Sequence, residues 1–155
     1  MASVGSMYAG EPLRLQALFE GKMNIENIEK WHFETNEKAC NYLLDLVLKG
    51  QKRATSSSAD GYLIENRALP KVGDLSVITD WADTPRCVIR TTSVRVLPYK
   101  DITFEIAKLE GEDDSIDSWR KNHERFFAEE GKEIGYEFSE NMMVVFEEFE
   151  VVEKL

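Results

Sequence analysis

The chain has 155 residues, of which 43% are hydrophobic and 31% charged, so it is long enough for one core-bearing domain but not for two full ones. Its net charge of −10 at pH 7 excludes a uniformly basic nucleic-acid coat and disfavours attachment to an anionic membrane. No window approaches the roughly 18 consecutive apolar residues of a membrane-spanning helix, and the start lacks a signal-peptide pattern. We therefore expect a cytoplasmic protein with no membrane partner.

Charge is distributed unevenly along the chain. Residues 1–35 sum to −2, residues 36–100 to +3 and residues 101–155 to −11. The central third can present a positive cleft, while the acidic last third keeps the remaining surface soluble and repels non-specific RNA or DNA. Ordinary solvated faces explain the same blocks equally well.

The first 22 residues show only weak periodicity. We expect residues 1–22 to be an extension, either native or left over from cloning, and residues 23–155 to form a single domain. The first clear pattern follows Thr35 and Asn36, either of which is a competent N-cap. Apolar residues then recur at the spacing of one helical face, and Gly50 is well placed to end the helix, so a helix is predicted over residues 36–49.

The rest of the chain alternates between strand and helix patterns. The polar stretch 51–58 is interpreted as a loop or the beginning of a strand. Further elements are predicted as antiparallel strands at 75–79 and 86–97, a short helix at 101–109, a longer helix at 115–130 and a closing strand at 142–152. Cys40 and Cys87 lie among apolar neighbours without CxxC spacing, which predicts reduced, buried thiols.

The first candidate for chemistry is the stretch 50–55, where a helix ends and two cations and a hydroxyl follow. Lys52 supplies three donors on a rotatable stem, and Thr55 supplies a donor, an acceptor or, when a base removes its proton, a nucleophile. Such a stretch can hold a phosphate or carbonyl oxygen, although a plain solvated loop explains it as well. It is not a Walker loop, which needs GxxxxGK[ST].

The second candidate is the acidic run 110–114, which has four carboxylates in five positions. Mutual repulsion makes such a cluster costly unless a cation, a metal ion or a lysine lies beside it. A bias of acidic residues toward the N-terminus of the next helix accounts for Asp113 and Asp114. It accounts less well for Glu110, which precedes Gly111.

The third candidate is an aromatic helix face formed by Trp119, His123, Phe126 and Phe127. The simpler interpretation is a helix face that packs in the core and includes one histidine whose ring nitrogens are hydrogen-bonded. The functional interpretation places Trp119 and His123 at a cleft, where they stack on a base or hydrogen-bond to it, with Arg120 on the rim.

Together these stretches resemble the ASCH domain, a member of the PUA-like superfamily. The resemblance runs from Trp31 to Val152, and its marks are residues 31–33 (WHF), 46–56 (LVLKGQKRATS), 69–74 (LPKVGD), Ala107 with 110–112 (EGE), and Trp119-Arg120 followed by His123 and Phe126-Phe127. It implies an α+β fold, a small PUA-like β-barrel with helices packed across its openings. The family's GxKxxT element, here residues 50–55, would line a cleft suited to RNA or nucleotides.

The resemblance also implies two alternative hydrolase chemistries. Small bacterial relatives remove the acetyl group from N4-acetylcytidine with a lysine, a threonine and a downstream glutamate. These correspond here to Lys52, Thr55 and, by the AxxE spacing from Ala107, Glu110. A longer relative is a metal-dependent ribonuclease, for which only Lys52 can be matched.

The two chemistries make opposite demands on Lys52. As a base that deprotonates Thr55, it needs a pKa lowered from about 10.4 toward 7 to 8 by burial or by a neighbouring cation such as Arg53. Glu110 would orient the lysine or carry the proton to the leaving amine, although its charge pushes the lysine pKa upward. A ribonuclease would keep Lys52 charged against the phosphate and offer carboxylates to Mg²⁺ or Mn²⁺, namely Glu110, Glu112 or Asp113.

We therefore expect a domain that binds RNA, a nucleoside or a nucleotide and acts on it as a hydrolase. The catalytic candidates are Lys52, Thr55 and Glu110, and the ligand-binding candidates are Arg53, Ser56, Trp119, Arg120 and His123. The alternative is a non-catalytic module that binds a nucleotide or modified RNA. The net charge of −10 favours it, because an enzyme that cleaves RNA broadly would benefit from a wider basic surface. No metal site, protein partner or cofactor is predicted beyond Mg²⁺ or Mn²⁺ in the ribonuclease case.

Overall fold

The computed structural model describes residues 23–155, and the expected extension, residues 1–22, lies outside them. Asn36 starts the first long helix, α2 (Glu37–Leu48), because its backbone is extended and its side chain accepts a hydrogen bond from Ala39 N. Gly50 then turns the chain away at φ +77°, a left-handed conformation that costs glycine little. The helix predicted over 36–49 is confirmed.

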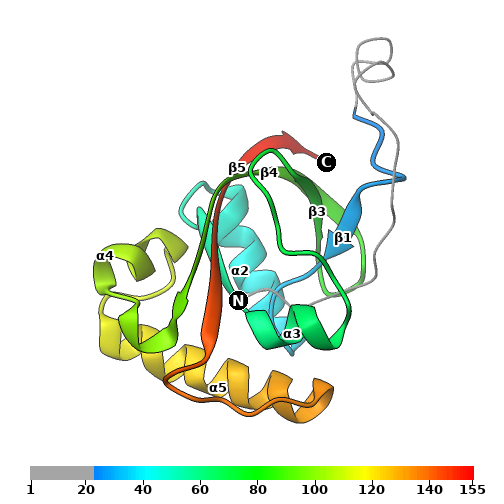
Figure 1. Ribbon diagram of the computed structural model, residues 1–155. Helices are drawn as coiled ribbons and strands as arrows, with labels where there is room; N and C mark the ends of the chain where they lie inside the picture. Colours follow the sequence, from blue (N-terminus) through cyan, green and yellow to red (C-terminus); the bar gives the residue numbers. More distant parts are fainter. Residues whose placement is uncertain (1–22) are drawn as a thin grey trace.

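Five strands form one sheet in the order β1-β3-β4-β5-β2 (Figure 1). They are β1 Glu29–Trp31, β2 Ala54–Ser58, β3 Leu75–Thr79, β4 Pro85–Pro98 and β5 Met143–Lys154. β1 is parallel to β3, and the other neighbours are antiparallel, including β3 with β4 as predicted. Within the described residues β1 and β2 remain unpaired edges, so the sheet is a half-barrel and not the closed barrel that was expected. Both edge strands are short, with three and five residues, which leaves little backbone to pair across the gap.

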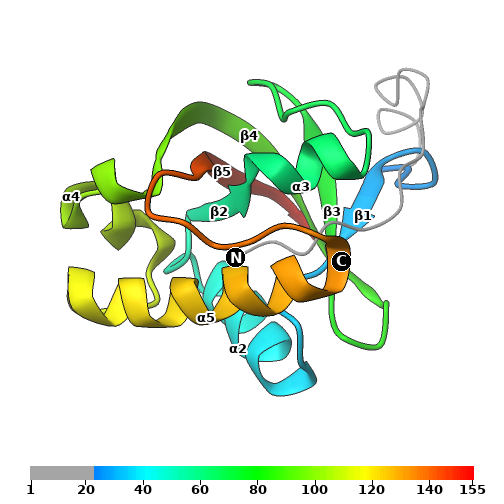
Figure 2. The same cartoon turned by 60° about the horizontal axis from the view of Figure 1, so that its bottom comes forward.

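The two longest strands, β4 and β5, bend as they cross the sheet (Figure 1), and Figure 2 shows the arch of β4. Their pairing shifts register at Val88/Ile89 and again at Thr91/Ser93. Bulges of this kind increase the local twist of a strand. The bend allows one sheet to pack on α2 with one part and on α5 (Ile116–Ile134) with another.

The helix expected over 101–109 is broken into three short pieces. These are a 3-10 turn (Tyr99–Asp101), α4 (Phe104–Ala107) and a second 3-10 turn (Lys108–Glu110), because the backbone of Ile102 is extended and Thr103 begins a new helix. α5 extends past the predicted boundary to Ile134, where Gly135 ends it in a left-handed conformation. No helix within residues 23–155 has the length and apolarity needed to cross a membrane.

Two elements were not predicted. β1 has only three residues and depends on pairing with the distant β3. α3 (Ala59–Ile64) follows β2 directly, and it begins at Ser58, whose side chain accepts a hydrogen bond from Gly61 N. The stretch 51–58 therefore contains both a strand and a helix cap.

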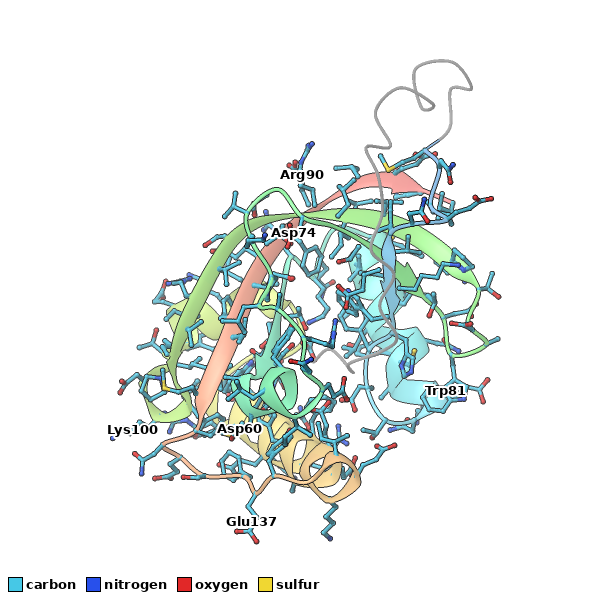
Figure 3. The ribbon with its side chains drawn as sticks, turned by 45° about the vertical axis from the view of Figure 1, so that its right-hand side comes forward. Asp60, Asp74, Trp81, Arg90, Lys100 and Glu137 are labelled. Atoms are coloured by element: carbon cyan, nitrogen blue, oxygen red, sulfur yellow. The ribbon has the colours of Figure 1, made fainter. Side chains whose placement is uncertain are left out.

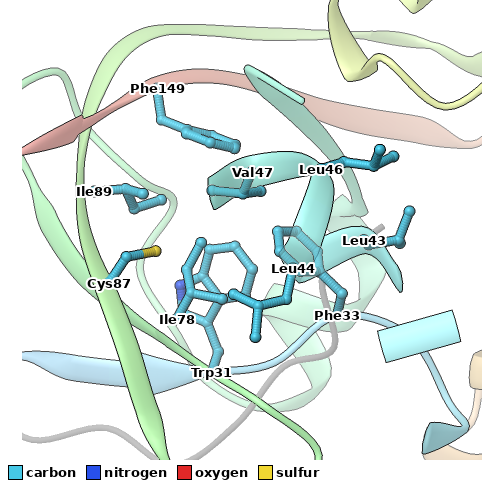
Figure 4. Close-up of a cluster of buried hydrophobic side chains, with 10 residues drawn as sticks. All are labelled: Trp31, Phe33, Leu43, Leu44, Leu46, Val47, Ile78, Cys87, Ile89 and Phe149. Atoms are coloured by element: carbon cyan, nitrogen blue, oxygen red, sulfur yellow. The ribbon is translucent and has the colours of Figure 1, made fainter. Parts of the chain in front are cut away.

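The apolar core has two main parts. The first lies between α2 and the sheet (Figure 4) and includes Trp31, Phe33, Leu43, Leu44, Val47, Ile78, Cys87, Ile89 and Phe149. The second lies against α5 and includes Tyr99, Trp119, Phe126, Phe127 and Val144. Cys40 and Cys87 are buried free thiols, which confirms that prediction.

Candidate functional site

The loop after α2 is held tightly against the turn that follows the second 3-10 helix. Gln51 Nε2 donates to the Gly111 carbonyl at 2.8 Å, and Arg53 N donates to the Leu109 carbonyl at 3.0 Å. Gly111 has φ +69°, and a Cβ added to it would lie 2.2 Å from the Gln51 carbonyl oxygen. Only glycine fits there without a backbone shift. This close approach brings together Lys52 and Glu110, which are 58 positions apart.

The Lys52 ammonium is enclosed by acceptors. Its Nζ donates to Glu112 Oε2 at 2.6 Å, to the Ala54 carbonyl at 2.8 Å and to Glu110 Oε1 at 3.3 Å, which uses all three of its protons. The Phe33 ring centroid lies 5.2 Å from Nζ, within the range of a cation–π contact. The side chains of Lys52 and Glu110 are both 0% exposed, so solvent does not screen their interaction.

Glu110 connects this lysine to β2 and α5. Its Oε2 accepts from Trp119 Nε1 at 2.6 Å and from Ser56 Oγ at 2.8 Å, and it lies 3.0 Å from His123 Nε2. His123 Nδ1 donates to the Trp119 carbonyl at 2.8 Å, and the two rings stack with centroids 3.9 Å apart. We call Lys52, Ser56, Glu110, Glu112, Trp119 and His123 the Lys52–Glu110 network.

The two charged residues of the network shift the pKa of each other. Burial alone would lower the pKa of Lys52, but the charges of Glu112 and Glu110 outweigh it and hold the pKa above its usual 10.5. Burial alone would raise the pKa of Glu110, but His123 and Lys52 hold it well below 4.5. Both residues are therefore charged at neutral pH. Lys52 is not in the neutral form that a general base requires.

Thr55 lies on the opposite face of β2 from Ser56, because successive side chains of a strand alternate. It is only 2% exposed, and no group within residues 23–155 hydrogen-bonds to its Oγ1. The structure thus brings Lys52 and Glu110 together but joins neither of them to Thr55 by a hydrogen bond. Leaving a buried hydroxyl unpaired costs about 1–3 kcal/mol, so this group calls for an explanation.

The other sequence candidates divide between the interior and the surface. Trp119 and His123 are 1% and 0% exposed, and both contact Glu110 inside the protein rather than on an open rim. Arg53 is exposed and Arg120 is half-buried. Within the described residues, neither arginine side chain takes part in a hydrogen bond or ion pair.

An open pocket of about 300 Å³ lies beside the loop of Lys52. Val47, Phe149 and Val151 contribute apolar walls, and Lys52 also lines the pocket. Three exposed cations border it, namely Arg53, Lys154 and Lys49, whose ammonium pairs with Asp45 at 2.6 Å. Glu150 also borders the pocket, but its carboxylate is paired with Arg90 at 2.6 Å. Figure 3 shows Arg90 at the edge of the molecule, pointing away from the fold.

Two carboxylates have roles that the sequence analysis missed. Glu112 is the nearest partner of Lys52, and the acidic run 110–114 did not show that it would turn back across Gly111 toward the lysine. Glu147 is 7% exposed on β5, directly opposite Thr55 in the β2–β5 register. A glutamate that alternates with Val145 and Phe149 on one side of β5 was the signal available for it.

A divalent cation does not fit the network as it stands. One ligand atom each from Glu110, Glu112 and His123 lies within 4.8 Å of the others, a spacing that could serve a metal ion. However, the Lys52 ammonium already contacts both carboxylates at 3.3 and 2.6 Å. A metal ion would face that charge at close range. Glu110 Oε2 also already accepts from Ser56 and Trp119.

Comparison with known proteins gives a consistent family match. Residues 29–153 match the model of the ASCH domain. The crystal structure of an ASCH domain from Lactobacillus crispatus is 38% identical, with a TM-score of 0.74 over 81% of this chain and 79% of that one. A crystal structure of a protein from Enterococcus faecalis is 33% identical, with a TM-score of 0.80 over 92% of this chain and 86% of that one. No curated protein matches the chain.

Proposed function

The chain belongs to the ASCH domain family, and from this membership and its surface chemistry we propose that it binds RNA or a nucleoside. The pocket beside the Lys52 loop carries the proposal. Its apolar walls suit a base, and its three cations suit phosphate oxygens. These cations gather locally on a chain whose net charge is −10, so a short ligand is favoured over a long duplex.

The Lys52–Glu110 network holds the loop that borders this pocket. It fixes the loop that carries Arg53 against the turn at Gly111, so the cationic rim is held in place before a ligand arrives. Preorganisation of this kind reduces the entropy lost on binding. In this proposal the network positions the pocket, and Lys52, which also lines it, keeps its ammonium bonded to Glu110 and Glu112.

Binding of cytidine monophosphate and of a short single-stranded RNA, followed by calorimetry, tests this proposal. Arg53→Ala and Lys154→Ala should each weaken binding roughly fivefold to tenfold, since an exposed phosphate contact contributes about 1 kcal/mol. Three cations that contact the phosphates of single-stranded RNA predict a slope of about −2 when the logarithm of the binding constant is plotted against the logarithm of the salt concentration. Lys100→Ala is a matched control, because this exposed lysine lies beyond the far end of β4. An equal effect of all three variants would contradict the assignment.

A second proposal is that the domain hydrolyses the acetyl amide of N4-acetylcytidine. The observation in its favour is the Thr55 hydroxyl, which is buried and has no partner among the described residues. A hydroxyl that is not engaged elsewhere is available as a nucleophile. Lys52 would act as a fixed positive charge and not as the base, because its pKa is raised.

Chromatography of N4-acetylcytidine after incubation with the protein tests the second proposal by the appearance of cytidine. Thr55→Val should abolish the product, and a chelator should leave it unchanged. Binding without product would identify a non-catalytic nucleotide-binding module. Cleavage of single-stranded RNA that requires added Mn²⁺ would instead support a ribonuclease and contradict the amide chemistry.

A further inference from the structure

The sheet face that packs on α2 is apolar over one part and polar over the next. The β-sheet register places Ile78, Cys87, Ile89 and Phe149 on this face, and all four belong to the core around α2. The same face continues through Thr91, Glu147, Thr55 and Ser57, which are 2% to 7% exposed. Ser56, the partner of Glu110, points to the other face. The domain therefore contains a second buried polar cluster that the Lys52–Glu110 network does not use.

Thr55 and Glu147 are direct cross-strand partners in this cluster. The Cβ atoms of such partners lie about 4.5–5.5 Å apart. A glutamate carboxylate at that separation can reach the opposite hydroxyl directly or through one water, which is the geometry required of a general base. Within residues 23–155 Thr55 Oγ1 forms no hydrogen bond, so Glu147 is not bonded to it in this structure and no other group competes for it.

The surroundings of Glu147 favour proton transfer near neutral pH. Burial and the charge of Asp74 raise the pKa of Glu147, the hydrogen bond from Thr91 and the charge of Arg67 lower it, and the result is a pKa of about 7. Asp74 lies in the turn before β3 (Figure 3), and Arg67 lies in the segment after α3. Burial and the charge of Glu147 also raise the pKa of Tyr62 in α3. A carboxyl group with this pKa can both accept and return a proton at pH 7.

We propose that Glu147 is the general base that accepts the proton of the Thr55 hydroxyl. The inference rests on the proposed N4-acetylcytidine hydrolysis and supplies the base that this reaction lacks, because Lys52 is held as an ammonium ion by Glu110 and Glu112. Glu147 is not among the sequence candidates.

The reaction proceeds in two balanced halves. In the first, Thr55 Oγ1 bonds to the acetyl carbonyl carbon as its proton passes to Glu147. The bond from that carbon to N4 then breaks, and Glu147 returns the proton to N4, which releases cytidine and leaves an acetyl ester on Thr55. In the second, water attacks the ester carbon and gives its proton to Glu147. The ester bond to Thr55 breaks as that proton returns to Oγ1, and acetic acid leaves.

The test compares Glu147→Gln with Glu148→Gln in the full chain. Glutamine removes the carboxylate at nearly constant volume. Glu148 is a matched control, because it is the next residue on β5, points to the other face and forms only a 3.6 Å ion pair with the exposed Arg95. Cytidine release is followed as a function of pH, and circular dichroism with thermal melting confirms that each variant is folded.

We expect Glu147→Gln to lower kcat at least about a hundredfold with little change in KM, and Glu148→Gln to remain within about threefold of wild type. The wild-type kcat should rise with pH through about 7, and this rise should disappear in Glu147→Gln. Wild-type turnover together with an active Glu147→Gln would overturn the role of Glu147 alone. Absence of turnover in the wild type would overturn the proposed hydrolysis, and this inference with it. If Glu147→Gln does not fold, Glu147→Asp replaces it. Its carboxylate is one methylene farther from Thr55, so kcat should fall while the rise of kcat with pH remains.

Discussion

Replacement of Lys52 by methionine probes the Lys52–Glu110 network most sharply. Methionine keeps an unbranched apolar stem in a fully buried position but removes the charge between Glu110 and Glu112. Glu110 would retain its hydrogen bonds from Ser56 and Trp119, whereas Glu112 would lose its 2.6 Å partner. Two carboxylates would then face each other without a counter-charge.

The expected loss of stability is large. Breaking a buried ion pair by removing one partner costs about 3–5 kcal/mol, and Lys52 is 0% exposed at its side chain, so screening by solvent does not reduce this figure. The pH dependence follows from the pKa shifts. The lowered pKa of Glu110 contributes stability above pH 4.5 that is lost as the pH falls through the folded value. The raised pKa of Lys52 contributes stability below pH 10.5 that is lost as the pH rises through the folded value.

Urea denaturation of wild type and Lys52→Met at pH 7 measures this loss. The matched control is Lys100→Met, which removes the same charge from an exposed position and should change the free energy of unfolding by less than about 0.5 kcal/mol. A loss of less than about 1 kcal/mol for Lys52→Met would mean that the Lys52–Glu110 pair behaves as an exposed salt bridge. That result would contradict its assignment as a buried pair that solvent does not screen.

Three further outcomes are expected. Gly111→Ala should lower the free energy of unfolding, measured in urea, by about 2 kcal/mol or more relative to Gly73→Ala. Both glycines have positive φ, but of the two only Gly111 would place a Cβ against backbone. Equal losses would contradict the close approach of Gly111 to the Gln51 carbonyl. The raised pKa of Glu147 stabilises the fold at low pH, and this stability is lost as the pH rises from 4.5 to about 7. The free energy of unfolding of Glu147→Gln should therefore gain up to about 3 kcal/mol relative to wild type between pH 4.5 and 8. A difference in melting between the two proteins that does not depend on pH would contradict the raised pKa. Mn²⁺ should leave the Tm of wild type unchanged but raise that of Lys52→Met, because only the variant removes the ammonium from Glu110 Oε1 and Glu112 Oε2. A rise in wild type would show that the ammonium does not block the site.

Local patterns predicted the elements whose signals are local. The helix α2 was recognised because its cap, apolar face and terminal glycine all lie within about four turns. β3, β4 and β5 were recognised from β-branched runs, although their bulges and curvature depend on pairing between distant strands. β1 and α3 were missed because each is short and is stabilised by contacts outside its own sequence.

The candidate site was only partly accessible from the sequence. Lys52 and Glu110 were singled out in two separate stretches, the family resemblance assigned them to one site, and the structure places them in contact. The consequence for the lysine pKa could not be read from spacing, because it depends on Glu112 turning back across Gly111. Glu147 was overlooked for a similar reason. Its position opposite Thr55 is a property of strand register, which a single sequence does not specify.

The most direct measurement is an NMR titration of the Lys52 side-chain nitrogen. A buried ammonium with all three protons bonded should give a slowly exchanging ¹⁵N–¹H₃ signal that is absent from Lys52→Met and persists beyond pH 10.5. Loss of that signal between about pH 7 and 8, the pKa range that a general base requires, would show that Lys52 is a neutral amine at working pH. It would return Lys52 to the role of base and contradict its assignment as an ammonium ion held by Glu110 and Glu112.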